Sequence, residues 1–223
     1  MLKKRHLAAA CALLLPLSAL SLPAHTSAAP RVATHARAAV HVGLVLDVGG
    51  RDDKSFNQLA YEGATAAQKK YGIQFNYVQS PTVSDQVYYE ELARFARAKD
   101  DLVIGVGFLM SKAMLKVAQQ FPNEHFAIID SSPQDAKGNT VNLPNVANIY
   151  FREQESGYLV GYMAGLMEKG KVGKATHNVI GTMGGISIPP VNRYIAGYIQ
   201  GARAADPSIK IKLGYSQSFT DEG

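Results

Sequence analysis

Cysteine is nearly absent from this sequence. The one cysteine, Cys11, lies within the first 28 residues, a segment interpreted below as a cleaved leader. The mature chain would then contain no cysteine, which excludes disulfides, cysteine nucleophiles and thiolate metal sites together. Cys11 is also poorly placed for lipid attachment, because most of the apolar run follows it, whereas lipoprotein cleavage needs that run before the cysteine.

An excess of charge of one sign is also lacking. The chain has 23 Lys and Arg against 18 Asp and Glu, and three of the bases, Lys3, Lys4 and Arg5, lie in the leader, which contains no acid. Removing these three leaves 20 bases against 18 acids, a net charge of +2. So small an excess gives no electrostatic footprint for nucleic acid.

Long hydrophobic runs are missing beyond the N-terminus. The first residues show the three bases, an apolar run over residues 7–17 and small residues ending at Ala28, a pattern typical of a secretory signal peptide. The run is too short to span about 30 Å of hydrocarbon, which disfavours a retained anchor. We therefore predict a signal peptide over residues 1–28, a flexible lead-in over 29–39, and export to the periplasm or the outer face of the cell membrane.

Motifs of nucleotide-dependent and hydrolytic enzymes are absent as well. Gly105 and Gly107 form only half of a dinucleotide fingerprint, because Met110 stands where the third glycine belongs. The sequence has no phosphate-binding Gly-Lys-Ser/Thr loop and no Gly-x-Ser-x-Gly nucleophile elbow. Three histidines stand at the starts of expected strands without metal-site spacing: His41, His125 and His177. We therefore predict no enzymatic activity, no metal site and no cofactor.

Hydrophobic periodicity from residue 40 onward predicts alternating strands and helices. Hydrophobic residues make up 47% of the chain, which is ample for a core. Apolar runs predict strands over residues 40–46, 73–77, 102–106 and 126–129. Helical spacing predicts helices over residues 56–71, 84–98 and 110–121. This alternation indicates βαβ units, and therefore an α/β fold with a parallel sheet sandwiched by helices.

The second half of the sequence repeats this alternation only briefly. After a strand over residues 146–151, we expect a helix over 153–168 whose Gly157, Gly161 and Gly165 allow another backbone to approach closely. A strand over 177–183, a helix over 189–204 and a strand over 209–215 follow, which make one complete βαβ unit. The expected domains are a first α/β lobe over 40–152, a crossover helix and linker over 153–174, and an incomplete second lobe over 175–223.

The loop after the first strand is the richest candidate site. Ligands of open parallel sheets lie at the carboxyl ends of the strands, and residues 47–58 read Asp-Val-Gly-Gly-Arg-Asp-Asp-Lys-Ser-Phe-Asn-Gln there. Ser55 and Gln58 fit a helix capping box, which would place Phe56 in the first helical turn beside the cleft. Loop chemistry alone leaves Asp47 as either a turn residue or a ligand contact, and Phe56 as either a core anchor or a ligand contact.

This loop resembles the signature of a known family. The run DxGGxxDxSFNQ over residues 47–58, with Gly63 beyond it, is similar to that of the basic membrane protein family, the purine-nucleoside receptors of bacterial ABC transporters. Further stretches agree in type and order: GVGF at 105–108, IIDS at 128–131, NV at 145–146, the glycine-rich helix at 157–165 and SFTD at 218–221. The resemblance covers the chain from about residue 40 to its end. It implies a type I periplasmic-binding fold with a complete first lobe and a partial second lobe.

The resemblance also implies a set of ligand-binding residues: Asp47, Phe56, Asn57, Asp130 and Tyr198. Asp47 and Asn57 would lie near the base, and Phe56 would stack on it. Asp130 would bind a ribose hydroxyl. A second aromatic, on the helix over residues 189–204, would cover the other face of the base. Tyr198 is the first choice for that ring and Tyr194, one turn earlier, is the alternative; the family usually has phenylalanine there.

Partner and length follow from the same resemblance. It implies a substrate-binding protein that delivers its ligand to a membrane permease and is a monomer when full length. Family members continue for about another hundred residues, a length typical of completing such a lobe, so we expect this chain to be C-terminally truncated. The alternatives are a sugar-binding receptor of the same fold and a nucleoside hydrolase that uses Asp47 and Asp130. A hydrolase needs a metal or a poised acid/base pair, which the sequence does not offer.

Overall fold

The computed structural model describes residues 39–219 of the chain. The predicted signal peptide over residues 1–28, with Cys11, and nearly all of the predicted lead-in over residues 29–39 lie outside the described residues. From residue 39 onward, strands and helices alternate as the periodicity predicts. Within the described residues, no helix is both long and apolar enough to cross a membrane.

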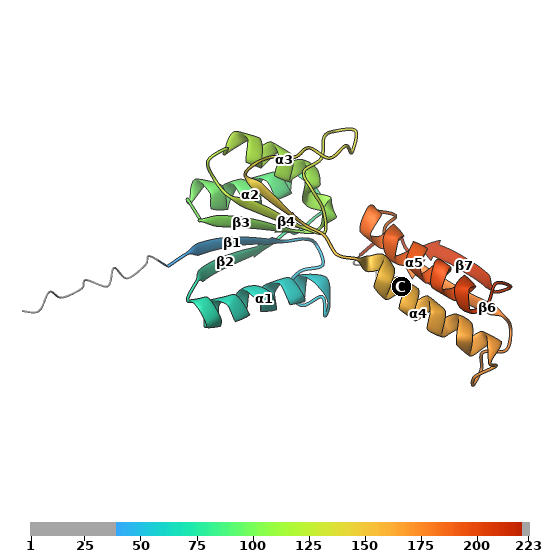
Figure 1. The fold of residues 1–223 in the computed structure, drawn as a ribbon. Helices are drawn as coiled ribbons and strands as arrows, with labels where there is room; N and C mark the ends of the chain where they lie inside the picture. The colour runs from blue at the N-terminus through green and yellow to red at the C-terminus, as the bar shows by residue number, and fades with distance from the viewer. Residues whose placement is uncertain (1–38, 220–223) are drawn as a thin grey trace, which may run out of the picture. The chain divides into compact units, whose positions relative to one another are not determined.

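A parallel sheet of five strands organises the first part of the described chain (Figure 1). The strands are β1 His41–Leu46, β2 Gln74–Gln79, β3 Leu102–Val106, β4 Phe126–Ile129 and β5 Val146–Ile149. They lie in the order β2-β1-β3-β4-β5, and each neighbouring pair runs parallel. β5 ends two residues before the predicted end, because the chain leaves the sheet there to enter the next helix.

Three helices cover the two faces of this sheet: α1 Phe56–Tyr71, α2 Asp85–Arg97 and α3 Ser111–Gln120, the last after a short 3-10 turn over Phe108–Met110. α1 lies on the face opposite to α2 and α3 (Figure 1). Side chains alternate along a strand. Val45 of β1 therefore packs under α2 and α3, whereas Leu44 and Leu46 pack with side chains of α1.

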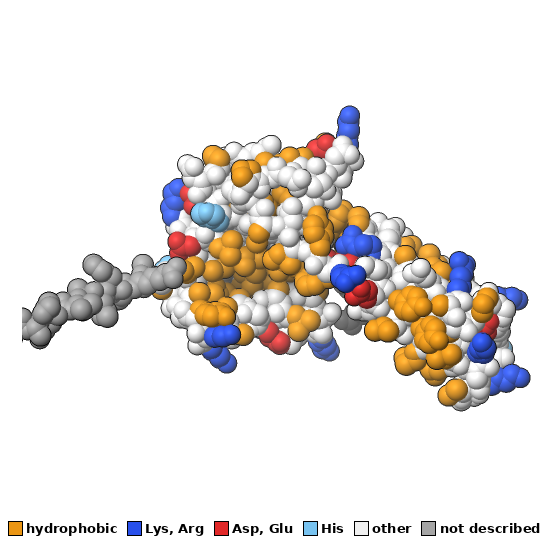
Figure 2. Space-filling model, viewed as in Figure 1, with side chains coloured by type: hydrophobic (Ala, Val, Ile, Leu, Met, Phe, Trp, Pro, Cys, Tyr) orange, Lys and Arg blue, Asp and Glu red, His pale blue; other side chains and the backbone are white. Residues whose placement is uncertain are grey.

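The face beside α1 is less covered than the other. α1 buries only Asn57, whereas α2 buries a row that includes Tyr88, Leu92 and Phe95. Figure 2 shows hydrophobic side chains gathered beside α1. The main core therefore lies between the sheet and the pair α2 and α3, and an apolar groove remains next to α1.

The second part contains α4 Glu153–Lys169, β6 Val179–Gly184, α5 Pro189–Ala205 and β7 Lys210–Tyr215. β6 and β7 form a two-stranded parallel sheet joined through α5, the single complete βαβ unit that the sequence predicts. β6 begins at Val179 and not at His177. The backbone N–H groups of His177 and Asn178 donate instead to the carboxylate of Glu168 on α4.

α4 and α5 pack against one another at very close range. A Cβ added to Gly161 would lie 1.9 Å from the backbone oxygen of Tyr198, and one added to Gly201 would lie 2.0 Å from that of Tyr158. Contacts this short leave no room for a side chain, so glycine is required on both helices. The predicted packing role of the glycine stripe is confirmed, and its partner is the backbone of α5.

Candidate functional site

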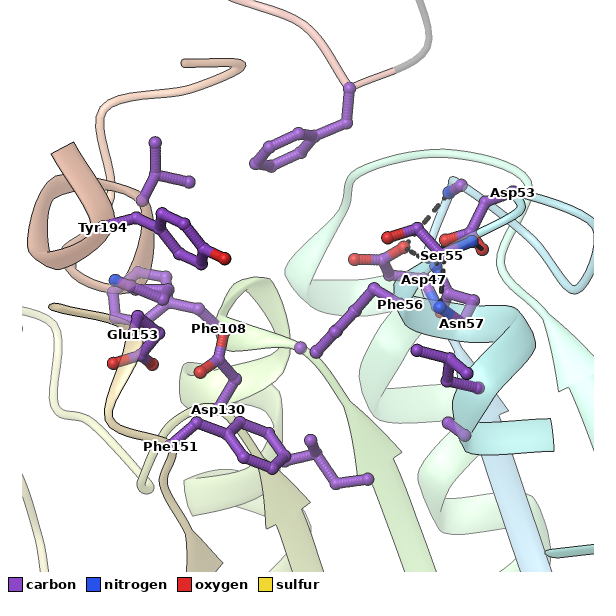
Figure 3. A pocket seen from close by; sticks show the side chains of 18 of the residues that line it. Asp47, Asp53, Ser55, Phe56, Asn57, Phe108, Asp130, Phe151, Glu153 and Tyr194 are labelled. Carbon is purple, nitrogen blue, oxygen red and sulfur yellow. Dashed lines mark hydrogen bonds between the residues drawn. The ribbon is translucent and has the colours of Figure 1, made fainter. Parts of the chain in front are cut away.

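A cavity of about 1650 Å³ opens at the carboxyl ends of β1, β3 and β4 (Figure 3). All five of the predicted ligand-binding residues line it: Asp47, Phe56, Asn57, Asp130 and Tyr198. The volume exceeds the roughly 300–1,000 Å³ of common small-molecule sites, because the cavity continues into the apolar groove beside α1. The polar end, where the five residues gather, is the candidate ligand site.

Asp47 and Asn57 form a buried, hydrogen-bonded pair at this end. Asn57 Nδ2 donates to Asp47 Oδ1 over 2.8 Å, and the Asp47 backbone N–H donates to Asn57 Oδ1 over 3.1 Å. Burial raises the pKa of Asp47, and the hydrogen bonds from Asn57 and from the Gly49 N–H oppose that rise. Among residues 39–219, no donor reaches Asp47 Oδ2. Asn57 thus orients Asp47 and leaves one carboxylate oxygen for a donor on a ligand.

The predicted capping box between Ser55 and Gln58 is wrong. Ser55 occupies the N-cap position of α1, but its side chain makes no capping hydrogen bond. The carboxylate of Asp53 accepts instead from the backbone N–H groups of Ser55, Asn57 and Gln58, at 2.9, 2.9 and 3.1 Å. An ionised carboxylate with two oxygens offers stronger, charge-assisted bonds than a single hydroxyl. The Ser55 side chain is left to line the cavity.

Phe56 begins α1 and points into the cavity (Figure 3). Its ring also packs against the small apolar cluster that β1 and β3 form with α1. Gly107, just after β3, makes room for it: a Cβ there would lie 3.0 Å from Asp47 Oδ2 and 3.5 Å from Phe56 Cε1, at a φ of +112°. Phe56 therefore contributes both to the core and to the wall of the cavity.

Asp130 lies across the cavity from Asp47 (Figure 3). It follows β4 with a φ of 69°, a left-handed conformation uncommon outside glycine, and its N–H donates to the carbonyl of Ile149 over 2.7 Å. Its carboxyl and that of Glu153 point toward one another. Burial, together with the facing carboxyl of Glu153 and its charge, raises the pKa of Asp130 to about 7.

Glu153 and Arg193 belong to the site although sequence reasoning missed them. Glu153 is the first residue of α4 and is only 8% exposed. Arg193 of α5 donates to both of its carboxylate oxygens, from Nε and Nη2, each over 2.8 Å. This two-pronged bond lowers the pKa of Glu153 to about 2. An acid in the first turn of a helix is usual, so nothing in the sequence marked Glu153 as part of a site.

Aromatic side chains complete the lining. Tyr198 is half-buried and burial raises the pKa of its hydroxyl, whereas Tyr194 is 48% exposed and points into the cavity (Figure 3). Both candidates for the second stacking ring therefore line the site. Three rings that sequence reasoning missed also line it: Phe108, Phe151 and Phe219. Each follows the carboxyl end of a strand, which is the signal that could have found them.

Within residues 39–219, no three or more His, Cys, Asp or Glu side chains are grouped so that they could hold a metal ion. The chemistry that the described site offers is that of carboxyls on both sides of the cavity, a set of aromatic rings and one arginine. These groups can bind a ligand that carries hydrogen-bond donors at two ends and a flat ring between them.

Comparison with known proteins identifies the family. A profile described as Bmp, ABC transporter substrate-binding protein PnrA-like, matches residues 40–223. An uncharacterised lipoprotein of Pyrococcus furiosus is 35% identical over 187 residues, which are 82% of this chain and 44% of the relative. The ABC transporter nucleoside-binding protein BmpA of Lactococcus lactis is 34% identical over 183 residues, 80% of this chain and 47% of that protein. The chain spans about half the length of these curated relatives.

Solved structures show the same fold. The match to an ABC transporter solute-binding protein from Aeropyrum pernix covers 79% of this chain and 46% of that protein, with 30% identity and a TM-score of 0.68. A sugar transporter from Clostridium phytofermentans, 17% identical with a TM-score of 0.57, shares the fold alone. The α/β fold of the type I periplasmic-binding class is thereby confirmed, and with it the class of substrate-binding proteins, not enzymes. The chain belongs to the family of PnrA-like ABC transporter substrate-binding proteins.

Proposed function

We propose that this protein is a receptor for purine nucleosides that delivers them to the membrane permease of an ABC transporter. The observation that carries the proposal is the ring of Phe56 in a cavity that has a carboxyl at either side, the buried Asp47 and the half-buried Asp130. A relative named as nucleoside-binding, BmpA of Lactococcus lactis, supports the same class of ligand.

The base of the nucleoside would stack on Phe56. Stacking on an aromatic side chain contributes about 1–3 kcal/mol per base and tolerates the identity of the base. Asp47 Oδ2 would accept an N–H of the base, in an orientation that Asn57 fixes through its 2.8 Å bond to the other oxygen. A tyrosine of α5, Tyr198 or Tyr194, would cover the second face of the base.

The ribose would lie toward Asp130. Its hydroxyls are donors, and a carboxyl oxygen in a partly dry site can accept hydrogen bonds from them. A free base would reach the ring and Asp47 but leave Asp130 without a donor, and free ribose would do the reverse. A nucleoside has both parts, so it fits this arrangement better than either part alone.

Location and partner are part of the same proposal. The predicted signal peptide over residues 1–28 would export the chain to the periplasm or the outer face of the membrane, and relatives named as lipoproteins support a position there. As a full-length monomer, the receptor would close its two lobes on the ligand, and that closure would report occupancy to the permease.

Calorimetry with adenosine, guanosine, inosine and ribose tests the proposal. We expect at least one nucleoside to bind more tightly than ribose and to be recovered intact by chromatography after incubation. Tighter binding of ribose than of every nucleoside would favour the sugar receptor. Release of free base during incubation would favour the hydrolase, and either result would refute the proposal.

A further inference from the structure

We infer that Glu153 and Arg193 are positioning residues for ligand binding, which hold Asp130 in place by sharing one proton with it. The inference rests on the proposed function, in which Asp130 is the contact to the ribose. It concerns two residues that are bonded to each other and whose charges act on Asp130, and that have no assigned part in recognition.

Three elements meet at this cluster. Asp130 stands at the end of β4, Glu153 opens α4 and Arg193 belongs to α5. The Arg193 guanidinium bonds both oxygens of Glu153 over 2.8 Å, so the Glu153 carboxylate cannot rotate freely. Its orientation is thereby set toward the carboxyl of Asp130 (Figure 3).

The oxygens of Asp130 show why a proton is needed. Asp130 Oδ1 is buried and has no hydrogen-bond partner among the described residues. Two facing carboxylates would also repel one another. One proton between them removes the repulsion and supplies the missing hydrogen bond. Arg193 keeps Glu153 ionised, so the proton resides on Asp130, and the three groups together are neutral.

This arrangement suits the binding of a neutral, hydroxyl-bearing ligand. With its proton directed at Glu153, Asp130 keeps a fixed orientation and retains one oxygen as an acceptor for a ligand hydroxyl. When the proton leaves, the charge of Glu153 repels Asp130 and the orientation is lost. Burial and Glu153 raise the pKa of Asp130 to about 7, so this loss falls near neutral pH.

Other titratable groups surround the cluster. They are Tyr150, Arg152, Glu155 and Tyr194 nearby and Asp47 and Asp53 elsewhere along the cavity. Arg152 and Glu155 form their own ion pair over 2.7 Å. The charges that act on Asp130 are those of Glu153, which raises its pKa, and of Arg193, which lowers it.

The test is Glu153→Gln in the full chain, with inosine affinity measured by calorimetry at pH 6 and pH 8. In the unchanged protein we expect affinity to fall about tenfold between these values, because pH 8 lies one unit above the pKa of Asp130. Glutamine can donate an N–H to the Asp130 carboxylate without a shared proton. The inosine affinity of the variant should therefore differ by less than about twofold between pH 6 and pH 8. Affinity that is constant or rises with pH in the unchanged protein, or the same fall in the variant, overturns the inference.

A carboxyl-carbon NMR titration of Asp130 in the ligand-free chain separates this inference from the proposed function. We expect a midpoint near 7 in the unchanged protein and a lower midpoint in Glu153→Gln, because burial still raises the pKa of Asp130 but the charge of Glu153 no longer does. Glu155→Gln, which removes an exposed acid from the same helical turn, should leave the midpoint unchanged. A midpoint near 4 in the unchanged protein overturns proton sharing, whether or not a nucleoside binds. If the midpoints are as expected but no nucleoside binds at any pH, proton sharing is supported and the proposed ligand is refuted.

Discussion

Asn57 fixes the geometry of the site at the scale of single residues. It is 2% exposed, and its amide nitrogen donates to Asp47 Oδ1 and Asp53 Oδ2 while its oxygen accepts from the Asp47 N–H. Neither a carboxylate nor an apolar side chain offers two donors and an acceptor in this shape. Asp47, the side chain proposed to contact the ligand, is therefore held in place by a neighbour whose own hydrogen-bonding groups are all used.

Phe56 gives the first prediction at this scale. Phe56→Ala should weaken nucleoside binding by about 1–3 kcal/mol, the usual contribution of a stacked base. Phe56→Leu should lose affinity as well but keep most of the packing against the cluster between α1 and the sheet. Calorimetry and thermal melting of both variants check this. Unchanged affinity with a sharply lower melting temperature would show that Phe56 acts only as a core residue.

The position of a site residue in the chain decides whether the sequence alone could predict it. Asp47 directly follows β1, and Phe56 and Asn57 open α1, so all three stand at element boundaries that are visible in the hydrophobic pattern; their roles came from the family resemblance. Glu153 and Arg193 are 40 residues apart and meet only because α4 lies on α5. Pairings of that kind depend on tertiary packing and leave no local pattern.

At the scale of elements, the contact between α4 and α5 positions several residues of the site. The carbonyls of Tyr194 and Tyr198 lie against Gly157 and Gly161, where an added Cβ would approach to 2.2 and 1.9 Å. The same contact brings Arg193 to Glu153. The rings of α5 and the cluster around Asp130 are therefore set by one helix pair.

Gly161→Ala should lower the free energy of unfolding by about 1–3 kcal/mol, because the added methyl group forces the two helices apart. Gly63→Ala on α1 is the matched control: no atom lies within 4 Å of its added Cβ, so it should stabilise the protein by about 0.5–1 kcal/mol. Urea denaturation measures both. An equal effect of the two substitutions would contradict the role assigned to close packing.

The elements themselves were largely predictable, since strands and helices have different hydrophobic periods. The predicted boundaries and caps of the elements were wrong where a side chain binds backbone groups that the hydrophobic pattern assigns to a strand or to a helix cap. β6 starts late because Glu168 binds the N–H groups of His177 and Asn178. The cap of α1 comes from Asp53 and not Ser55. Both cases need a contact outside the local pattern.

At the scale of the whole molecule, the two parts of the described chain, residues 39–219, differ in how many elements they contain. The first has five strands, and its main core lies under α2 and α3, while the second has two strands and one helix pair. Large apolar side chains of the second part are exposed, among them Leu159 at 70% and Met183 at 76%. Two-stranded sheets with open edges exchange and associate readily.

Hydrogen exchange on the purified chain tests this difference. Amides of β7 Lys210–Tyr215 should exchange about tenfold faster or more than those of β3 Leu102–Val106, because fewer buried contacts oppose their opening. Light scattering should show association that grows with concentration. Equal protection of the two strands in a monomeric sample would contradict this prediction.

The central claim is that a nucleoside lies with its base on Phe56 and its ribose at Asp130. The most direct measurement is a set of intermolecular NOEs between inosine and the chain. We predict contacts from the base protons to the ring of Phe56, and from the ribose protons to the Asp130 β-protons. Ribose protons against Phe56, or inosine bound away from both residues, would contradict the account.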